Sequence, residues 1–160
     1  MLALAERKVL TMQVFSSGRL GRLIQMGFGP GDFLLEGIRQ GLTQQGVQNA
    51  VLLSGIGTLK RVRYHRVTTT LPEPTNAFPQ WEAPIEISSI SGLVVNGEPH
   101  LHMTFSDLDS TQGVHLEDGC EVLYLAELMF AEVEGVAWQR LEDAYGVKLL
   151  YGCQGRDISV

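Results

Sequence analysis

Apolar and polar residues alternate along most of the chain, and this period of two predicts short β-strands. Such runs occupy residues 21–28, 50–56, 59–69, 85–91, 92–95, 114–116, 121–133, 136–141 and 147–151. The pair Asn96-Gly97 stands between two apolar-rich segments, where it predicts a tight hairpin turn. Four prolines fall between residues 71 and 84, a stretch that we expect to be a long loop.

One segment has helical rather than strand periodicity. Four apolar residues recur at helical spacing with polar residues opposite them: Leu34, Leu35, Ile38 and Leu42. Asp32 is placed to cap the first turn, and Gly46 stands where a left-handed C-terminal cap is expected. We therefore predict an α+β fold: a compact single domain with a largely antiparallel sheet and one main helix at about 31–45. Residues 1–20 are expected to form an arm, 21–152 the domain and 153–160 a tail.

Length and charge narrow the class of protein. The 160 residues suit one domain, and their formal net charge of −6 argues against a broad DNA-binding surface. We find no apolar run long enough to span a bilayer and no secretory signal near the start. Cys120 and Cys153 lack metal-site or disulfide-scaffold spacing, which predicts two free thiols in a cytoplasmic protein.

The most informative chemistry lies in three histidines close together in the sequence. Residues 94–105 read as a strand, so His100 and His102 share one face while Leu101 and Met103 share the other. The polar stretch 107–112 would let the chain reverse and bring His115 beside them. Three imidazoles with an open fourth position are a ligand set of catalytic zinc. A solvent-facing, purely hydrogen-bonded pair of histidines is the simpler alternative.

Carboxylates near this predicted site are the candidates for proton transfer. Glu86 lies in the preceding strand and is the first choice, either as an acid or base or as a carboxylate that holds a histidine ring. Glu98 shares the parity of His100 and is the second choice. His65 is interpreted as an ordinary surface histidine.

A short basic cluster offers the best candidate for nucleic-acid contact. Lys60, Arg61 and Arg63 occur within four residues. Their alternation with apolar residues favours the solvated face of an antiparallel strand over a DNA-binding patch.

Several stretches, taken in order, resemble the PPC (plants and prokaryotes conserved) domain. The resemblance covers roughly residues 21–136. It rests on these motifs: Pro-Gly-Asp-Phe-Leu-Leu-Glu-Gly-Ile at 30–38, Val-Leu-Leu-Ser-Gly-Ile-Gly-Thr-Leu at 51–59, Ile-Glu-Ile-Ser-Ser-Ile-Ser-Gly at 85–92, Gly-Glu-Pro-His-Leu-His at 97–102, Gly-Val-His-Leu at 113–116, and 120–128. Family members often have glycine at the position of Val114 and an acidic residue at that of Phe33.

The resemblance implies a compact α+β homotrimer. In plants the domain follows AT-hook motifs in nuclear DNA-binding proteins, and bacterial members are described as DNA-binding for that reason. This chain has no Arg-Gly-Arg-Pro core of an AT-hook. The fold is also similar to that of acetolactate decarboxylase, a zinc enzyme with a comparable His-x-His…His set, which supports zinc at His100, His102 and His115.

These observations leave two functions open. One is a trimeric metal-binding protein, with catalysis on a small carbonyl or ester substrate undecided; the other is a DNA-binding module with a structural metal or none. DNA binding is expected to be weak. The trimer interface is expected to include apolar residues of the late segment, Leu123, Leu125, Leu128, Phe130 and Val133.

Overall fold

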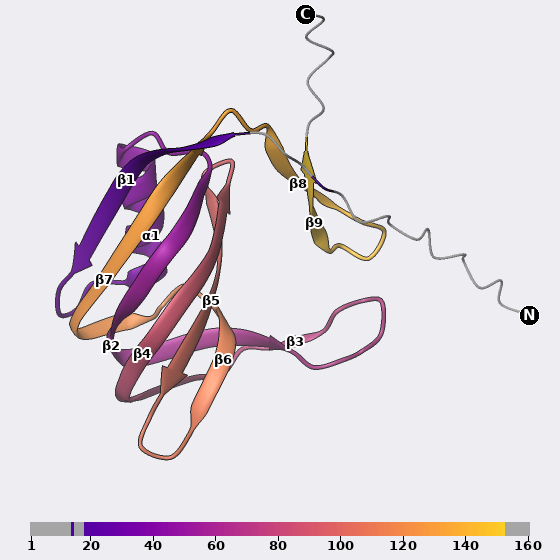
Figure 1. The fold of residues 1–160 in the computed structure, drawn as a ribbon. Helices are drawn as coiled ribbons and strands as arrows, with labels where there is room; N and C mark the ends of the chain where they lie inside the picture. Colours follow the sequence, from indigo (N-terminus) through magenta and orange to yellow (C-terminus); the bar gives the residue numbers. More distant parts are fainter. Residues whose placement is uncertain (1–13, 15–17, 153–160) are drawn as a thin grey trace, which may run out of the picture.

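The chain folds into a curved sheet with one helix against it, and a separate two-stranded hairpin follows (Figure 1). The computed structural model describes residue 14 and residues 18–152. Its elements are β1 (Arg19–Phe28), α1 (Leu34–Gln44), β2 (Ala50–Val67), β3 (Asn76–Ala77), β4 (Gln80–Val95), β5 (Glu98–Ser106), β6 (Thr111–Leu116), β7 (Glu121–Glu134), β8 (Trp138–Glu142) and β9 (Lys148–Gly152).

The main sheet has the strand order β1-β7-β2-β4-β5-β6, and all of its pairings are antiparallel. The far end of β2 also pairs with β6, so the sheet curls back on itself like part of a barrel. With α1 as the one helix of the described residues, this confirms the predicted α+β fold. The hairpin at Asn96-Gly97 is confirmed too, since both residues have positive φ and Val95 pairs with Glu98.

Helix α1 packs its apolar stripe onto one face of the sheet. Its four predicted core residues are all buried: Leu34, Leu35, Ile38 and Leu42. Each such side chain contributes about 1.5–3 kcal/mol when it is fully buried. The inward residues of β5, including Leu101, Met103 and Phe105, complete the same core, so their alternating neighbours must face outward.

The start of α1 differs from the prediction. Asp32 makes no cap: its Oδ2 accepts the backbone N–H of Gly29 at 2.8 Å, and Phe33 is the N-cap residue without a side-chain cap bond. The backbone of Asp32 is committed to β7, since its carbonyl accepts the N–H of Val122 at 2.9 Å. The helix therefore begins at Leu34. Gly46, with φ of 67°, follows the helix end as expected.

Two strands are longer than the sequence pattern predicts. β2 is one strand across Gly57, where the ladder to β7 shifts register instead of ending. β4 begins at Gln80, inside the expected loop, and Pro84 falls between Glu82 and Ile85, a stretch where the pairing with β2 is also irregular. A proline without an N–H donor is tolerated at such an interruption.

In the late segment, β7, two of the residues expected at the interface are buried in the core instead. Phe130 is 0% exposed and Leu128 only 3%, so both belong to the core rather than to a surface patch. Leu125 is 46% exposed, and Leu123 and Val133 are partly exposed. The buried positions Val122, Ala126, Leu128 and Phe130 are all even-numbered, so the expected set combined residues of both parities.

The ends of the chain and the cysteines complete the description. The predicted arm lies mostly outside the described residues, as do the tail and Cys153; β1 starts at Arg19, two residues earlier than expected. Cys120 is a buried free thiol, and burial raises its pKa to about 11. Within the part of the chain that the structure describes, no helix has the length and apolar character needed to cross a membrane.

Candidate metal centre

Strand pairing aligns three histidines in a row across the outer face of β5, β6 and β2. His102 lies directly opposite His115, and His115 lies directly opposite His65. Directly paired residues of neighbouring strands carry Cβ atoms about 4.5–5.5 Å apart on the same face. His100 joins the row because it lies two residues before His102 on β5. All four histidines of the chain therefore meet at one place.

The three histidines expected from the sequence converge. The ring centroids of His100 and His102 are 5.3 Å apart, and those of His115 lie 4.9 and 5.2 Å from them. The Nε2 atoms of His100 and His102 are 3.3 Å apart. One nitrogen from each ring lies within 4.8 Å of the others. The 3.3 Å separation of the His100 and His102 Nε2 atoms suits an ion about 2.0–2.1 Å from each.

His65 and Glu117 extend the cluster, and sequence reasoning missed both. The His65 ring stacks on that of His115 at a centroid distance of 4.0 Å. Nδ1 of His65 is 2.5 Å from Oε1 of Glu117, and the same oxygen is 3.2 Å from Nδ1 of His115. All three side chains are about one quarter exposed or less. The sequence could have indicated Glu117, since it lies two residues after His115. His65 reaches the site only through the pairing of β2 with β6.

Burial and mutual repulsion keep the central imidazoles uncharged. Desolvation, followed by the neighbouring His65 and His100, lowers the pKa of His115 to about 4 against the opposing effect of Glu117. Desolvation also lowers the pKa of His100, followed by the positive charge of Arg140. Neutral imidazole is the form that binds metals. The lowered pKa values of His100 and His115 therefore favour their metal-binding form at neutral pH.

The two carboxylates expected from the sequence lie elsewhere. Glu86 pairs with Ser106, four residues beyond His102, which places it about 13 Å along the strand at 3.3 Å per residue. The Glu98 carboxylate instead faces Arg39 of α1, at 3.5 Å from the guanidinium. The structure thus brings Glu117, rather than Glu86 or Glu98, to the histidines.

The basic cluster on β2 is largely neutralised by acidic neighbours. Lys60 pairs with Glu121 at 3.3 Å, and Arg61 contacts both Glu82 at 3.2 Å and Glu121 at 2.9 Å. Arg63 donates to the backbone carbonyl of Asp118 at 3.4 Å. Little uncompensated positive charge is left there for phosphates.

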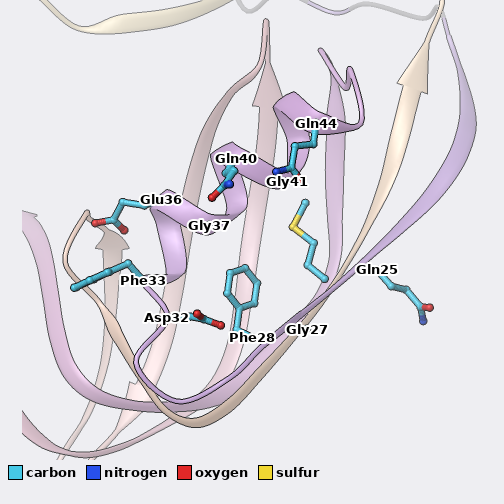
Figure 2. A pocket seen from close by; sticks show the side chains of 11 residues that line it. Gln25, Gly27, Phe28, Asp32, Phe33, Glu36, Gly37, Gln40, Gly41 and Gln44 are labelled. Carbon is cyan, nitrogen blue, oxygen red and sulfur yellow. The ribbon is translucent and has the colours of Figure 1, made fainter.

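A separate pocket of about 590 Å³ lies between β1 and α1 (Figure 2). The Phe28 ring and the Met26 side chain point toward the helix, where Gly37 and Gly41 leave room for them. The pocket is lined by β1, α1 and the turn between them and contains none of the histidines. The metal-ligand chemistry is therefore on the outer sheet face, away from this pocket.

Solved structures with the same fold come from several prokaryotes. A plant- and prokaryote-conserved protein of Pyrococcus horikoshii is 26% identical, with a TM-score of 0.72 over 89% of this chain and 99% of its own. A metal-containing protein of Archaeoglobus fulgidus is 24% identical, with a TM-score of 0.75 over 88% and 99%. A candidate DNA-binding protein of Bacteroides thetaiotaomicron is 16% identical, with a TM-score of 0.71 over 85% and 96%.

The expected likeness to acetolactate decarboxylase stays a prediction. A Staphylococcus aureus protein described as similar to that enzyme has a TM-score of 0.47 over 68% of this chain. No curated protein matches the chain in sequence. The family model of the Plants and Prokaryotes Conserved (PCC) domain matches residues 15–134. The chain therefore belongs to the Plants and Prokaryotes Conserved domain family.

Proposed function

We propose that the protein binds one divalent metal ion, most simply zinc, through His100, His102 and His115. The observation that carries the proposal is the convergence of three imidazoles from two paired strands, with ligand nitrogens within 4.8 Å of one another. Imidazole ligands suit zinc, and three of them match a known catalytic ligand set. The metal-containing protein of Archaeoglobus fulgidus shares this fold, which is consistent with a metal site here.

Three protein ligands leave one position open on the ion. A bound zinc ion would supply Lewis acidity there, polarising a carbonyl or lowering the pKa of water toward about 7. This chemistry suits a small carbonyl or ester substrate. The residues of the chain would hold the ion, and the Glu117 carboxylate, 3.2 Å from Nδ1 of His115, is near enough to accept a proton.

Metal content is the direct test. Protein prepared without a histidine tag should take up zinc, and elemental analysis after dialysis should find that the zinc stays bound. His102→Asn should lower zinc affinity by at least 10-fold, because only two histidines of the set remain. Glu82→Gln, an exposed substitution on the neighbouring strand β4, is the matched control and should leave affinity unchanged. Wild-type protein that takes up no zinc would refute the proposal.

We also propose that the protein assembles as a homotrimer, as the family resemblance implies. Exposed apolar side chains lie on two adjacent strands of the sheet: Leu53 and Ile56 of β2, and Tyr124 and Leu125 of β7. Contiguous apolar surface of this kind usually marks an interface. Threefold symmetry would bury the same patch on every subunit.

DNA binding is the second candidate function. It is favoured by the Bacteroides thetaiotaomicron neighbour, described as a candidate DNA-binding protein. The charge distribution argues against tight binding, because the chain carries a net charge of −6 and Lys60 and Arg61 are already paired with carboxylates. We expect only weak binding, measured by fluorescence anisotropy at two salt concentrations. Tight binding with a steep salt dependence would favour the regulatory function instead.

A further inference from the structure

The histidine row contains a second group of metal ligands beside the first. His65, His115 and Glu117 each offer one ligand atom, and these atoms lie within 4.8 Å of one another. The group comes from two strands joined only by the closure of the sheet, β2 and β6, and from the residue after β6. It shares His115 with the first group and no other residue.

The shared histidine has a nitrogen without a partner. Nδ1 of His115 is buried and makes no hydrogen bond to any residue that the structure describes, although Oε1 of Glu117 lies 3.2 Å away. That oxygen is already engaged by Nδ1 of His65 at 2.5 Å, and the approach to His115 does not have hydrogen-bond geometry. A buried nitrogen left without a hydrogen-bond partner is unfavourable, so such an atom calls for a ligand.

We propose that His65, His115 and Glu117 bind a second divalent cation, bridged to the first by the imidazole ring of His115. An imidazole has two nitrogens on different edges of the ring, so Nδ1 can serve the second ion while Nε2 serves the first. The side-chain torsion χ2 of histidine is broad, and rotation of the His65 ring out of its stack lets its nitrogen turn toward the shared ion.

The chemistry of the ligands favours a borderline metal such as zinc or copper. Two imidazole nitrogens and one carboxylate oxygen form a ligand set that such metals accept. When the second ion binds, the N–H proton of His115 leaves to solvent and the ring becomes a bridging imidazolate, while Glu117 contributes a negative charge. Arg63 lies on the same face two residues from His65, but its guanidinium is directed to the Asp118 carbonyl.

This inference rests on the proposed function for its first ion, and metal stoichiometry separates the two. Untagged apoprotein is titrated with zinc, and bound metal is measured after removal of the excess. Four variants are compared with wild type: His65→Asn and Glu117→Gln for the second group, the double variant His100→Asn/His102→Asn for the first, and Glu82→Gln as a control. Circular dichroism and thermal melting verify that each variant is folded.

The expected result is about two zinc ions per chain in wild type and Glu82→Gln, and about one in each of the other three variants. Copper supplies a second readout: two Cu²⁺ ions joined by one imidazolate couple magnetically, so the wild-type EPR signal should be weaker than its copper content. In His65→Asn the signal should match the copper content.

Other stoichiometries overturn one proposal or both. A single ion that survives His65→Asn and Glu117→Gln but is lost in the double variant refutes the second site and leaves the proposed function intact. A single ion with the opposite pattern refutes the first site and keeps the second. No bound metal in folded wild type refutes both.

Discussion

At the residue scale, Gly92 determines how closely β4 can approach the histidine strand. It pairs with Leu101, and its φ is 146°, a value that other residues rarely adopt. A Cβ atom added there would lie 2.1 Å from the backbone oxygen of His100. The backbone of a candidate ligand thus has its position set by a glycine on the neighbouring strand.

Gly92→Ala should therefore lower the free energy of unfolding by about 3 kcal/mol or more, since neither backbone can move without disturbing the sheet. Chemical denaturation with circular dichroism measures the change. Gly113→Ala is the matched control, because a Cβ at that position meets nothing within 4 Å and φ is not in the left-handed region. Equal stability of the two variants would contradict this account of Gly92.

The individual histidines of the site differ in whether the sequence predicts them. His100 and His102 follow from the two-residue period of a strand, and His115 follows from a plausible turn between neighbouring strands. His65 lies 50 residues before His115, and only the curvature of the whole sheet brings the two together. Local patterns carry no signal for that pairing, which is why His65 was interpreted as an ordinary surface residue.

At the element scale, the turn between β5 and β6 sets the register that places His102 opposite His115. Oδ1 of Asp107 accepts the backbone N–H groups of Asp109 at 2.9 Å and Ser110 at 2.7 Å. These bonds lower the pKa of the Asp107 carboxyl group. The carboxylate form is therefore favoured in the folded state, and the turn is held by it.

Asp107→Ala should lower the thermal midpoint at pH 7 because it removes these hydrogen bonds. A lowered folded-state pKa gives stability that is present above the ordinary aspartate pKa and is lost as pH falls through the folded value. The difference from wild type should therefore shrink near pH 3. Calorimetry at both pH values tests this. Asp109→Ala in the same turn is the control, and a deficit in Asp107→Ala that stayed constant at low pH would contradict the proposed charge dependence.

The boundaries of helices and strands could be predicted where one hydrophobic period dominates the sequence, and less well where pairing in the sheet shifts them. The stripe of α1 gave the helix within a few residues, but the sheet contact of the Asp32 backbone moved its start to Leu34. β2 and β4 are longer than expected because irregular pairing lets each strand continue past a glycine or a proline. Such breaks in a ladder have no clear sequence signature.

At the scale of the whole molecule, the exposed apolar residues of β2 and β7 are the expected contact between subunits. Leu125→Glu should leave the fold intact and reduce the mass measured by light scattering from trimer to monomer, because the charge would be buried in the interface. Phe130→Glu should instead unfold the chain, since Phe130 is fully buried within one subunit. A trimer that survives Leu125→Glu would place the interface elsewhere.

The closure of β2 onto β6 has a consequence for the order in which the molecule folds. Hairpins such as β4–β5 and β5–β6 join neighbouring segments, whereas His65 and His115 meet only after an intervening loop of some 50 residues is closed. Contacts between residues far apart in the chain must overcome a larger loop-closure entropy, and they form slowly. The β5–β6 hairpin alone can assemble His100, His102 and His115 early in refolding. The second ligand group, which includes His65 and Glu117, is complete only when the sheet has closed, so it forms last.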